Sequence, residues 1–143
     1  MEIKATCLLP AVLLCALVGT GTAHADPTGL WLAQDGGKVH VGPCGRALCG
    51  TLVSVEPPTD PATGMPWTDK NNPDQARRER PLVGVAVFIS MTPDGQGKWV
   101  GQLYDADSGE TLSGHFFEID HQTLRVEGCK GNLCGNENLS RIK

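Results

Sequence analysis

The sequence lacks a hydrophobic run long enough to cross a membrane as a helix. Its one extended apolar stretch, residues 7–18, falls short of the roughly 20 apolar residues that a spanning helix needs. Lys4 precedes this stretch, and the small residues Ala23-His24-Ala25 follow it as an A-x-A cleavage pattern. This arrangement is typical of a secretory signal peptide. We predict a signal peptide over residues 1–25, a single mature domain over residues 26–143 without a membrane span, and a periplasmic or secreted location.

A lipid anchor at Cys15 is the alternative interpretation of the same N-terminal region. Lipidation motifs of exported proteins need a small residue directly before the modified cysteine. Leu14 occupies that position here. Cleavage after Ala25 therefore fits the sequence better.

The sequence also lacks an excess of positive charge. Its 12 Lys and Arg residues are outnumbered by 16 Asp and Glu residues, and the formal net charge is −4. Nucleic acids and anionic membranes attract proteins through basic surfaces. We therefore predict no nucleic-acid partner.

No catalytic or metal-binding motif stands out. No serine or cysteine lies in a recognised nucleophile motif, and Asp105-x-Asp107 lacks the glycine and the distant glutamate of a calcium loop. We predict no catalytic residue, no metal site and no cofactor, although the sequence leaves enzymatic activity open. A hydrolase that uses Asp69, Tyr104, Asp105 or His115 is the least favoured function, and we expect these side chains to be dispersed.

Four cysteines remain after removal of the signal peptide: Cys44, Cys49, Cys129 and Cys134. Four cysteines in a small exported domain predict two disulfides. Each close pair has four intervening residues, which is neither the C-x-x-C spacing of thiol oxidoreductases nor the closer spacing of zinc knuckles. Local hairpin closure favours Cys44–Cys49 and Cys129–Cys134, with bonds between the two hairpins as the alternative.

Short alternating segments separated by turn residues dominate the mature sequence. Asp35-Gly36-Gly37, for example, divides two such segments. We expect about eight strands, near residues 28–34, 38–41, 52–55, 82–91, 98–104, 110–119, 123–127 and 139–142. This pattern predicts an all-β fold, either a small antiparallel barrel or a sandwich. A barrel of about eight strands is filled by its side chains or holds one small ligand, so we expect no large cavity.

A loop rich in proline and charge, residues 56–81, interrupts the strand pattern. Loops of this length are usually functional or disordered. Asn72 followed by Pro73 predicts the start of a short helix that spans about residues 73–79. The next segment, residues 82–91, is apolar on both faces, and we expect the loop, with Trp67 and the helix, to cover its second face.

Several motifs in order resemble the bacterial exported family known as domain of unknown function 2147. They are Gly29-Leu30-Trp31, the segment at Cys44–Gly50, the run from Asp69 to Gly84, the segment at Gly101–Gly109 and the L-R-V-E-G-C segment that ends at Cys129. The resemblance implies a small lipocalin-like β-barrel with no assigned activity. The family pattern ends in T-W-T-R, whereas this sequence has Asn138-Leu139-Ser140-Arg141 and so loses an aromatic residue.

The candidate ligand-binding residues are Arg80, Asp69, Asn72, Tyr104, Asp105 and Trp67. Arg80 leads this set because an arginine fork matches carboxylate or phosphate groups, and because it precedes Pro81 at the start of an apolar strand. The alternative for the Arg77–Arg80 run is a solvated helix face paired to Asp74 and Glu79. Asp69, Asn72 and Asp105 have turn capping as their alternative role.

The combined sequence evidence predicts a binding module that holds a small ligand between the open end of the barrel and the loop at residues 56–81. The alternative is a cell-envelope interaction module that uses this loop as its contact surface for another protein. The oligomeric state does not follow from the sequence.

Overall fold

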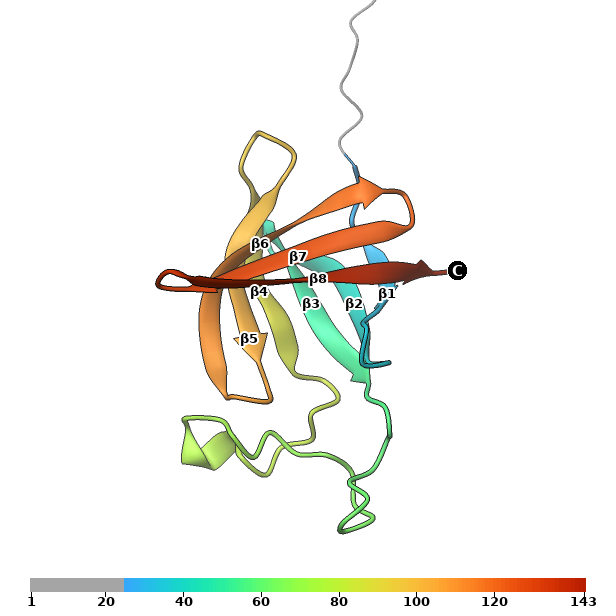
Figure 1. The fold of residues 1–143 in the computed structure, drawn as a ribbon, viewed down its shortest axis with the longest axis vertical. Coiled ribbons are helices and arrows are strands. Elements are labelled where there is room, and N and C mark those ends of the chain that lie inside the picture. Colours follow the sequence, from blue (N-terminus) through green and yellow to red (C-terminus); the bar gives the residue numbers. More distant parts are fainter. Residues whose placement is uncertain (1–24) are drawn as a thin grey trace, which may run out of the picture.

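The protein is an antiparallel β-barrel of eight strands in sequential order, closed by pairing of the first strand with the last (Figure 1). The computed structural model describes residues 25–143, so the predicted signal peptide lies outside the described residues except for Ala25. The strands are β1 (Gly29–Leu32), β2 (Lys38–Cys44), β3 (Ala47–Ser54), β4 (Ala86–Pro93), β5 (Trp99–Asp105), β6 (Glu110–Asp120), β7 (Thr123–Lys130) and β8 (Leu133–Ile142). The predicted small all-β barrel is confirmed.

Tight turns connect most neighbouring strands. Between β1 and β2, Gly36 adopts a φ of +88°, and the backbone N–H of Gly37 donates to the side chain of Asp35 over 2.8 Å. A positive φ suits glycine because glycine has no Cβ. In residues 25–143 no helix has the length and apolar character needed to cross a membrane.

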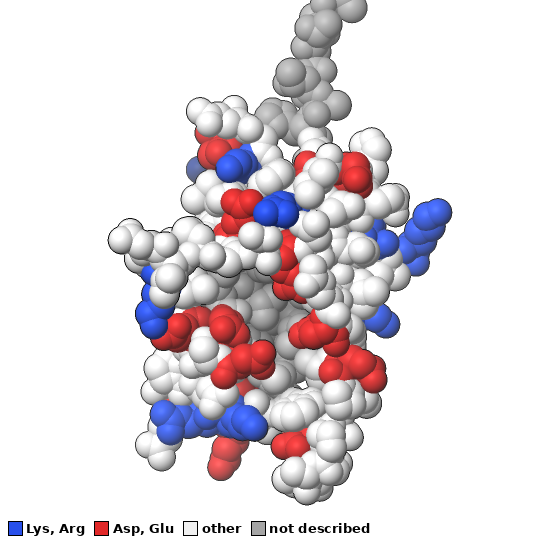
Figure 2. Space-filling model, in the orientation of Figure 1, with Lys and Arg blue, Asp and Glu red and all other residues white. Residues whose placement is uncertain are grey.

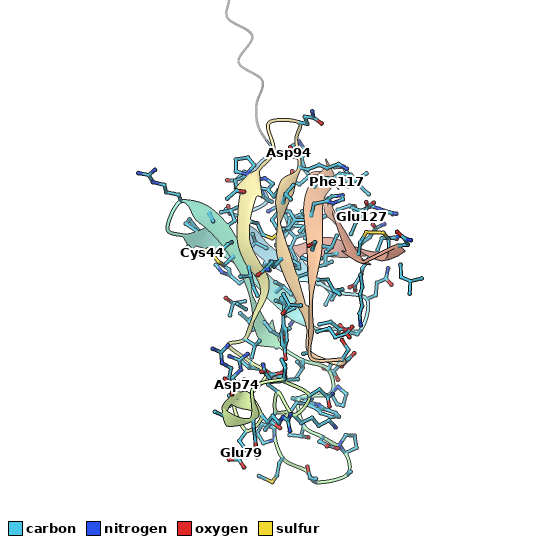
Figure 3. The ribbon with its side chains drawn as sticks, turned by 90° about the vertical axis from the view of Figure 1, so that its left-hand side faces the viewer. Cys44, Asp74, Glu79, Asp94, Phe117 and Glu127 are labelled. Carbon is cyan, nitrogen blue, oxygen red and sulfur yellow. A yellow bond between two sulfur atoms is a disulfide. The ribbon has the colours of Figure 1, made fainter. Side chains whose placement is uncertain are left out.

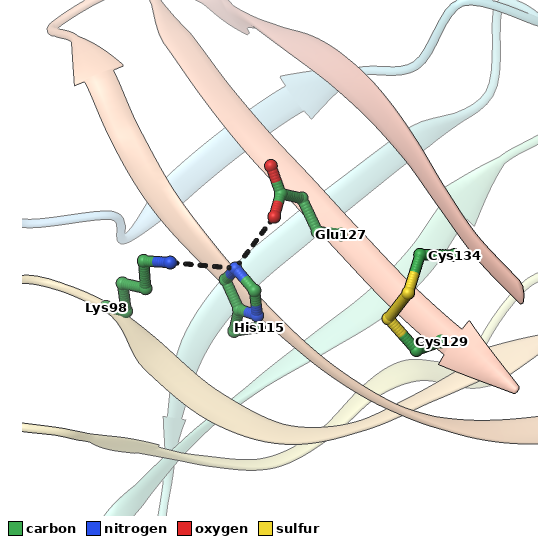
Figure 4. The surroundings of a disulfide bond; sticks show 5 residues. All are labelled: Lys98, His115, Glu127, Cys129 and Cys134. Atoms are coloured by element: carbon green, nitrogen blue, oxygen red, sulfur yellow. Dashed lines mark hydrogen bonds and ion pairs between the residues drawn. A yellow bond between two sulfur atoms is a disulfide. The ribbon is translucent and has the colours of Figure 1, made fainter. Parts of the chain in front are cut away.

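Two disulfides join the ends of two hairpins. Cys44–Cys49 links β2 to β3, and Cys129–Cys134 links β7 to β8 (Figure 4). Both predicted pairings are confirmed. The second hairpin is longer than expected, because the ladder continues through Cys129↔Cys134 to Lys130↔Leu133, so that β8 begins at Leu133 and not near Leu139.

One end of the barrel is filled by large side chains. Trp31, Met91, Phe116 and Leu124 are fully buried, and Phe116 packs on Phe88 with ring centroids 5.4 Å apart. A glycine on β3 makes room for this packing, since a Cβ at Gly50 would lie only 2.4 Å from the Phe88 ring. The filled end is the hydrophobic core that holds the barrel together.

Arg141 on β8 packs against the filled end and connects three segments there. Its guanidinium lies 4.1 Å from the centroid of the Trp31 ring, donates to Glu118 over 2.6 Å and donates to the Thr28 carbonyl over 2.7 Å. Leu139, which stands where the family pattern has tryptophan, is 2% exposed. The barrel therefore closes normally despite the missing aromatic residue.

The bounds of strand β4, Ala86–Pro93, differ at both ends from the predicted range of residues 82–91. The strand begins at Ala86, not at Leu82, because Leu82–Val85 forms an irregular turn in which Gly84 has a φ of +99° and donates to the Leu52 carbonyl over 2.7 Å. Within β4, Ser90 has a φ of +50° and the register with β5 shifts. This bulge lets both Phe88 and Met91 face the core, although residues three positions apart lie on opposite faces of a regular strand.

The long loop lies beyond one end of the barrel (Figures 1 and 3) and does not run along the outer face of β4 as we expected. Its predicted helix is reduced to one 3-10 turn at Gln75–Arg77. Asp74, not Asn72, caps this turn by accepting from the backbone N–H of Ala76 over 3.0 Å. Asn72 caps the bend just before this turn, because its Oδ1 atom accepts from the backbone N–H of Asp74 over 2.9 Å while its amide donates to Asp69 and Tyr104.

Candidate functional site: the barrel cavity

The end of the barrel opposite the filled core is hollow and forms a cavity of about 720 Å³. This volume corrects the expectation that the barrel holds no large cavity. The wall is made mostly of apolar side chains that project inward from the strands: Val39, Leu52, Val87, Phe88, Leu103, Leu112, Val126 and Leu139. Figure 2 shows the hollow on the face that it displays.

Two paired glycines help to keep the cavity empty. Gly128 on β7 and Gly135 on β8 are register partners, and both line the cavity. A Cβ at Gly135 would meet no atom within 4 Å. Side chains at these positions would occupy the cavity, so glycine at both positions leaves this volume free.

Carboxylates surround the mouth of the cavity. The acidic residues that line it, which we call the acidic rim, are Asp35, Asp105, Asp107, Glu110 and Glu137. Four come from the β1–β2 turn, the β5–β6 turn and the adjoining ends of β5 and β6, while Glu137 comes from the middle of β8 and accepts from Gln34 after β1. Figure 2 shows acidic side chains bordering the hollow. Lys130 also lines the cavity and forms an ion pair with Glu110.

The other four rim carboxylates have no ion-pair partner within residues 25–143. Glu137 accepts from the backbone N–H of Gln34 over 2.8 Å, and Asp105 accepts from the Ser108 hydroxyl over 2.7 Å. These donors are neutral, so they fix the positions of the carboxylates without cancelling their charge. The mouth is therefore strongly negative.

A buried polar cluster fastens the long loop beside this mouth. Asp69 is 0% exposed and accepts from the Tyr104 hydroxyl over 2.5 Å. Its other oxygen accepts from the Asn72 amide over 2.8 Å and from Nε and Nη2 of Arg80 over 2.9 and 2.8 Å. We call these four residues the anchor cluster. Because a buried charge is costly unless it is paired and hydrogen-bonded, this complete set of partners is what permits Asp69 to be buried.

The anchor cluster shifts the ionisation of two of its members. Burial raises the pKa of Asp69, but the hydrogen bonds from Tyr104, Asn72 and Arg80 outweigh burial, so its pKa lies below the ordinary value. Burial, followed by the hydrogen bond to Asp69, raises the pKa of Tyr104. At neutral pH the pair is therefore a tyrosine hydroxyl that donates to a carboxylate.

A second contact joins the loop to the acidic rim. The Asn71 amide donates to the Asp107 carbonyl over 2.7 Å. Gly109 packs so closely on the loop that a Cβ there would lie 1.8 Å from the Asn71 carbonyl oxygen. The loop thus rests on the β5–β6 turn and supports the segment that carries Asp105 and Asp107.

The structure brings four of the six predicted binding residues together, namely those of the anchor cluster. Asp105 lies on the cavity mouth, while Trp67 donates its indole N–H to the Pro57 carbonyl over 2.9 Å within the loop. Of the arginine run, Arg77 pairs with Asp74 at 3.2 Å, as the solvated-face alternative expected. Arg80 pairs with Asp69, and so its guanidinium is already engaged by a carboxylate.

The expectation that Asp69, Tyr104, Asp105 and His115 are dispersed is wrong for Asp69 and Tyr104, which share a hydrogen bond. His115 belongs to the other face of β6, where its Nε2 atom lies 3.1 Å from Glu127 and 3.3 Å from Lys98 (Figure 4). Asp69 is fully buried with both oxygens occupied. This arrangement suits it to hold the loop.

Most of the acidic rim does not stand out in the sequence. Glu110 and Glu137 were not singled out, although each stands two residues before an inward-facing leucine, Leu112 and Leu139. Alternate residues of a strand share one face. This spacing could have placed both glutamates on the inward faces of their strands.

A closed antiparallel barrel, filled at one end and hollow at the other, defines the lipocalin-like class. The solved structure of HP1028 from the human pathogen Helicobacter pylori, which is described as belonging to the lipocalin family, has the same fold. The TM-score is 0.69 at 16% identity, and the match covers 83% of this chain and 84% of the other.

Residues 29–141 match the family described as uncharacterized protein conserved in bacteria, DUF2147. The chain belongs to this family, and the resemblance that its motifs indicated is confirmed. No curated protein shows a significant match to the chain.

Proposed function

We propose that this protein is an exported, non-catalytic binding module that holds one small, largely apolar ligand in the barrel cavity. The observation that carries the proposal is the cavity of about 720 Å³ with its apolar wall. Small-molecule sites typically occupy about 300–1,000 Å³ and are lined mainly by apolar side chains with a few polar groups.

The apolar wall supports this function. Val39, Val126 and Leu139 line the cavity, and each of these apolar side chains is less than 10% exposed. A ligand with an apolar body would remove the remaining apolar surface of the wall and its own apolar surface from water, which is favourable.

The disulfides support export. Disulfides persist mainly in oxidising compartments such as the periplasm and the extracellular space. Cys44–Cys49 and Cys129–Cys134 agree with the signal peptide predicted for residues 1–25. A carrier in such a compartment would meet small molecules from outside the cytoplasm.

Fluorescence titration with N-phenyl-1-naphthylamine, an uncharged apolar probe, tests the proposal. We expect saturable binding of one probe molecule per chain. Gly135→Phe places a ring in the cavity, because a Cβ at Gly135 meets no atom within 4 Å. This substitution should weaken binding of the probe at least about tenfold by occupying its space.

Ser140→Phe is the matched control, because Ser140 lies on the same strand but is exposed and outside the cavity lining. Its affinity for the probe should equal that of the unmodified protein. Absence of saturable binding, or equal weakening by both substitutions, would overturn the proposal. Melting temperatures of both variants verify that the barrel is folded.

A further inference from the structure

The charge of the cavity mouth defines the ligand more narrowly. We infer that the cavity takes a single-chain amphiphile whose apolar tail enters the barrel and whose cationic head group, such as an alkylammonium, lies within the acidic rim. This inference rests on the proposed function, because it specifies the ligand of the same cavity.

The cavity separates its apolar and charged surfaces by depth. The inner wall consists of residues such as Leu103, Val126 and Leu139, while the carboxylates lie at the mouth, four in turns or at strand ends and Glu137 beside the β1–β2 connection. An elongated molecule with an apolar tail and one polar end matches this division. A uniformly apolar ligand would leave the rim without a partner.

The positive charge of the head group is inferred from the ion pairs around the mouth. Lys130, the cationic side chain that lines the cavity, is paired with Glu110. On the adjacent loop, Arg80 and Arg77 are paired with Asp69 and Asp74. Arg78 donates to the Asn72 carbonyl and Lys70 lies over the Trp67 ring, so within residues 25–143 none of these four cations forms an ion pair with a rim carboxylate. The remaining rim carboxylates therefore present an uncompensated negative field, which attracts a cation and repels an anion.

The spacing of the rim favours an organic cation over a metal ion. Within residues 25–143, no group of three His, Cys, Asp or Glu side chains is arranged to hold a metal ion. The carboxylates are distributed around an opening and do not converge on one point. A head group several atoms wide can interact with such a ring, whereas a metal ion needs ligands at about 2.0–2.6 Å.

Two rim residues are suited to a direct test. Asp107 has an exposed side chain without a hydrogen bond among the described contacts, and Glu137 accepts one bond that a glutamine oxygen can also accept. Asp107→Asn with Glu137→Gln therefore removes two charges and leaves the shape of the mouth almost unchanged.

The test compares three probes with the same ten-carbon chain: decylammonium, decanol and decanoate. Each displaces N-phenyl-1-naphthylamine in a competition titration at pH 7.5 and low salt, below its micelle concentration. We expect decylammonium to bind most tightly and decanoate most weakly. The double variant should lose about fivefold to tenfold in affinity for decylammonium and keep its affinity for decanol.

Asp94→Asn with Asp120→Asn is the control of equal charge. Asp94 lies in the β4–β5 turn and Asp120 is the last residue of β6, and Figure 3 shows Asp94 at the end of the barrel away from the long loop. This control should bind all three probes as the unmodified protein does. A rise to 0.5 M NaCl should weaken decylammonium binding alone, because exposed charges are screened.

The outcomes separate the two proposals. If decanol or decanoate binds as tightly as decylammonium, or if both double variants behave alike, the cationic head group is refuted while the binding cavity stands. If neither N-phenyl-1-naphthylamine nor any ten-carbon probe binds, the proposed function itself fails, and the inference fails with it.

Discussion

The hydroxyl of Tyr104, at the end of β5, donates a hydrogen bond of 2.5 Å to Asp69 in the middle of the long loop. The two residues are 35 positions apart in the sequence. This bond links the barrel wall to the loop, since Tyr104 lines the cavity and Asp69 is held in turn by Asn72 and Arg80. The shape of the mouth thus depends on one buried carboxylate.

Ionisation of Tyr104 should report directly on this bond. Tyr104 is the single tyrosine of the chain, so ultraviolet absorption of tyrosinate follows it alone. Because burial and the hydrogen bond to Asp69 raise its pKa, we expect its titration above the ordinary value of about 10. Asp69→Asn should move the midpoint down toward that value. A midpoint near 10 in the unmodified, folded protein would contradict the buried bond.

Acid should lower the stability of the protein through protonation of Asp69. Its pKa in the folded protein is lower than in the unfolded chain, where it is near 3.8, so its contribution to stability is complete above pH 3.8 and is lost as the pH falls through the folded value. We expect the free energy of unfolding to decline below about pH 4. Asp69→Asn should lower stability at pH 7 by about 2 kcal/mol and flatten this decline.

Urea denaturation measured at intervals from pH 7 to pH 2.5 checks the acid dependence. Asp74→Asn is a suitable comparison, because Asp74 is exposed and pairs only with the exposed Arg77. It should leave the pH profile nearly unchanged. Identical profiles for the Asp69→Asn protein and the unmodified protein would refute the role of Asp69.

The two disulfides should differ in their effect on binding. Each closes a short loop, so replacement of either pair by serine should cost about 2 kcal/mol or less. Cys134 lines the cavity, whereas Cys44 and Cys49 lie outside its lining. We expect Cys129→Ser with Cys134→Ser to weaken binding of N-phenyl-1-naphthylamine, and Cys44→Ser with Cys49→Ser to leave it unchanged at a temperature where both are folded. Equal affinities of the two variants would contradict this prediction.

The length of the ligand tail should set its affinity. Burial of each methylene contributes about 0.8 kcal/mol, which corresponds to about fourfold in the dissociation constant. Alkylammonium probes of six, eight and ten carbons should therefore bind progressively more tightly, until the cavity is full. Isothermal titration calorimetry measures the series. Affinities that do not change with tail length would place the probe on the rim alone, outside the apolar cavity.

Local sequence features predicted much of the barrel. Turn residues such as Asp35-Gly36-Gly37 and the alternation along β6 depend on neighbours within a few positions, and both appear in the structure as expected. The pairing of Cys129 with Cys134 followed from the same local closure. In contrast, the irregular turn at Leu82–Val85 and the bulge at Ser90 depend on packing against β3 and β5, which no local pattern encodes.

The candidate site shows the same division between features set by neighbouring residues and features set by tertiary packing. The sequence alone determined an all-β fold of short hairpins and the set of polar residues in the loop, and it favoured the two local disulfides, because turn chemistry and two-residue periodicity are local. The choice of a barrel over a sandwich came from the family resemblance. Only the tertiary structure decided that Asp69 is buried against Tyr104, that one end of the barrel is hollow and that Asp35, Asp107 and Glu137 surround one mouth. These relationships join residues far apart in the chain, and they form only when the strands pair into the closed barrel and the long loop folds against it.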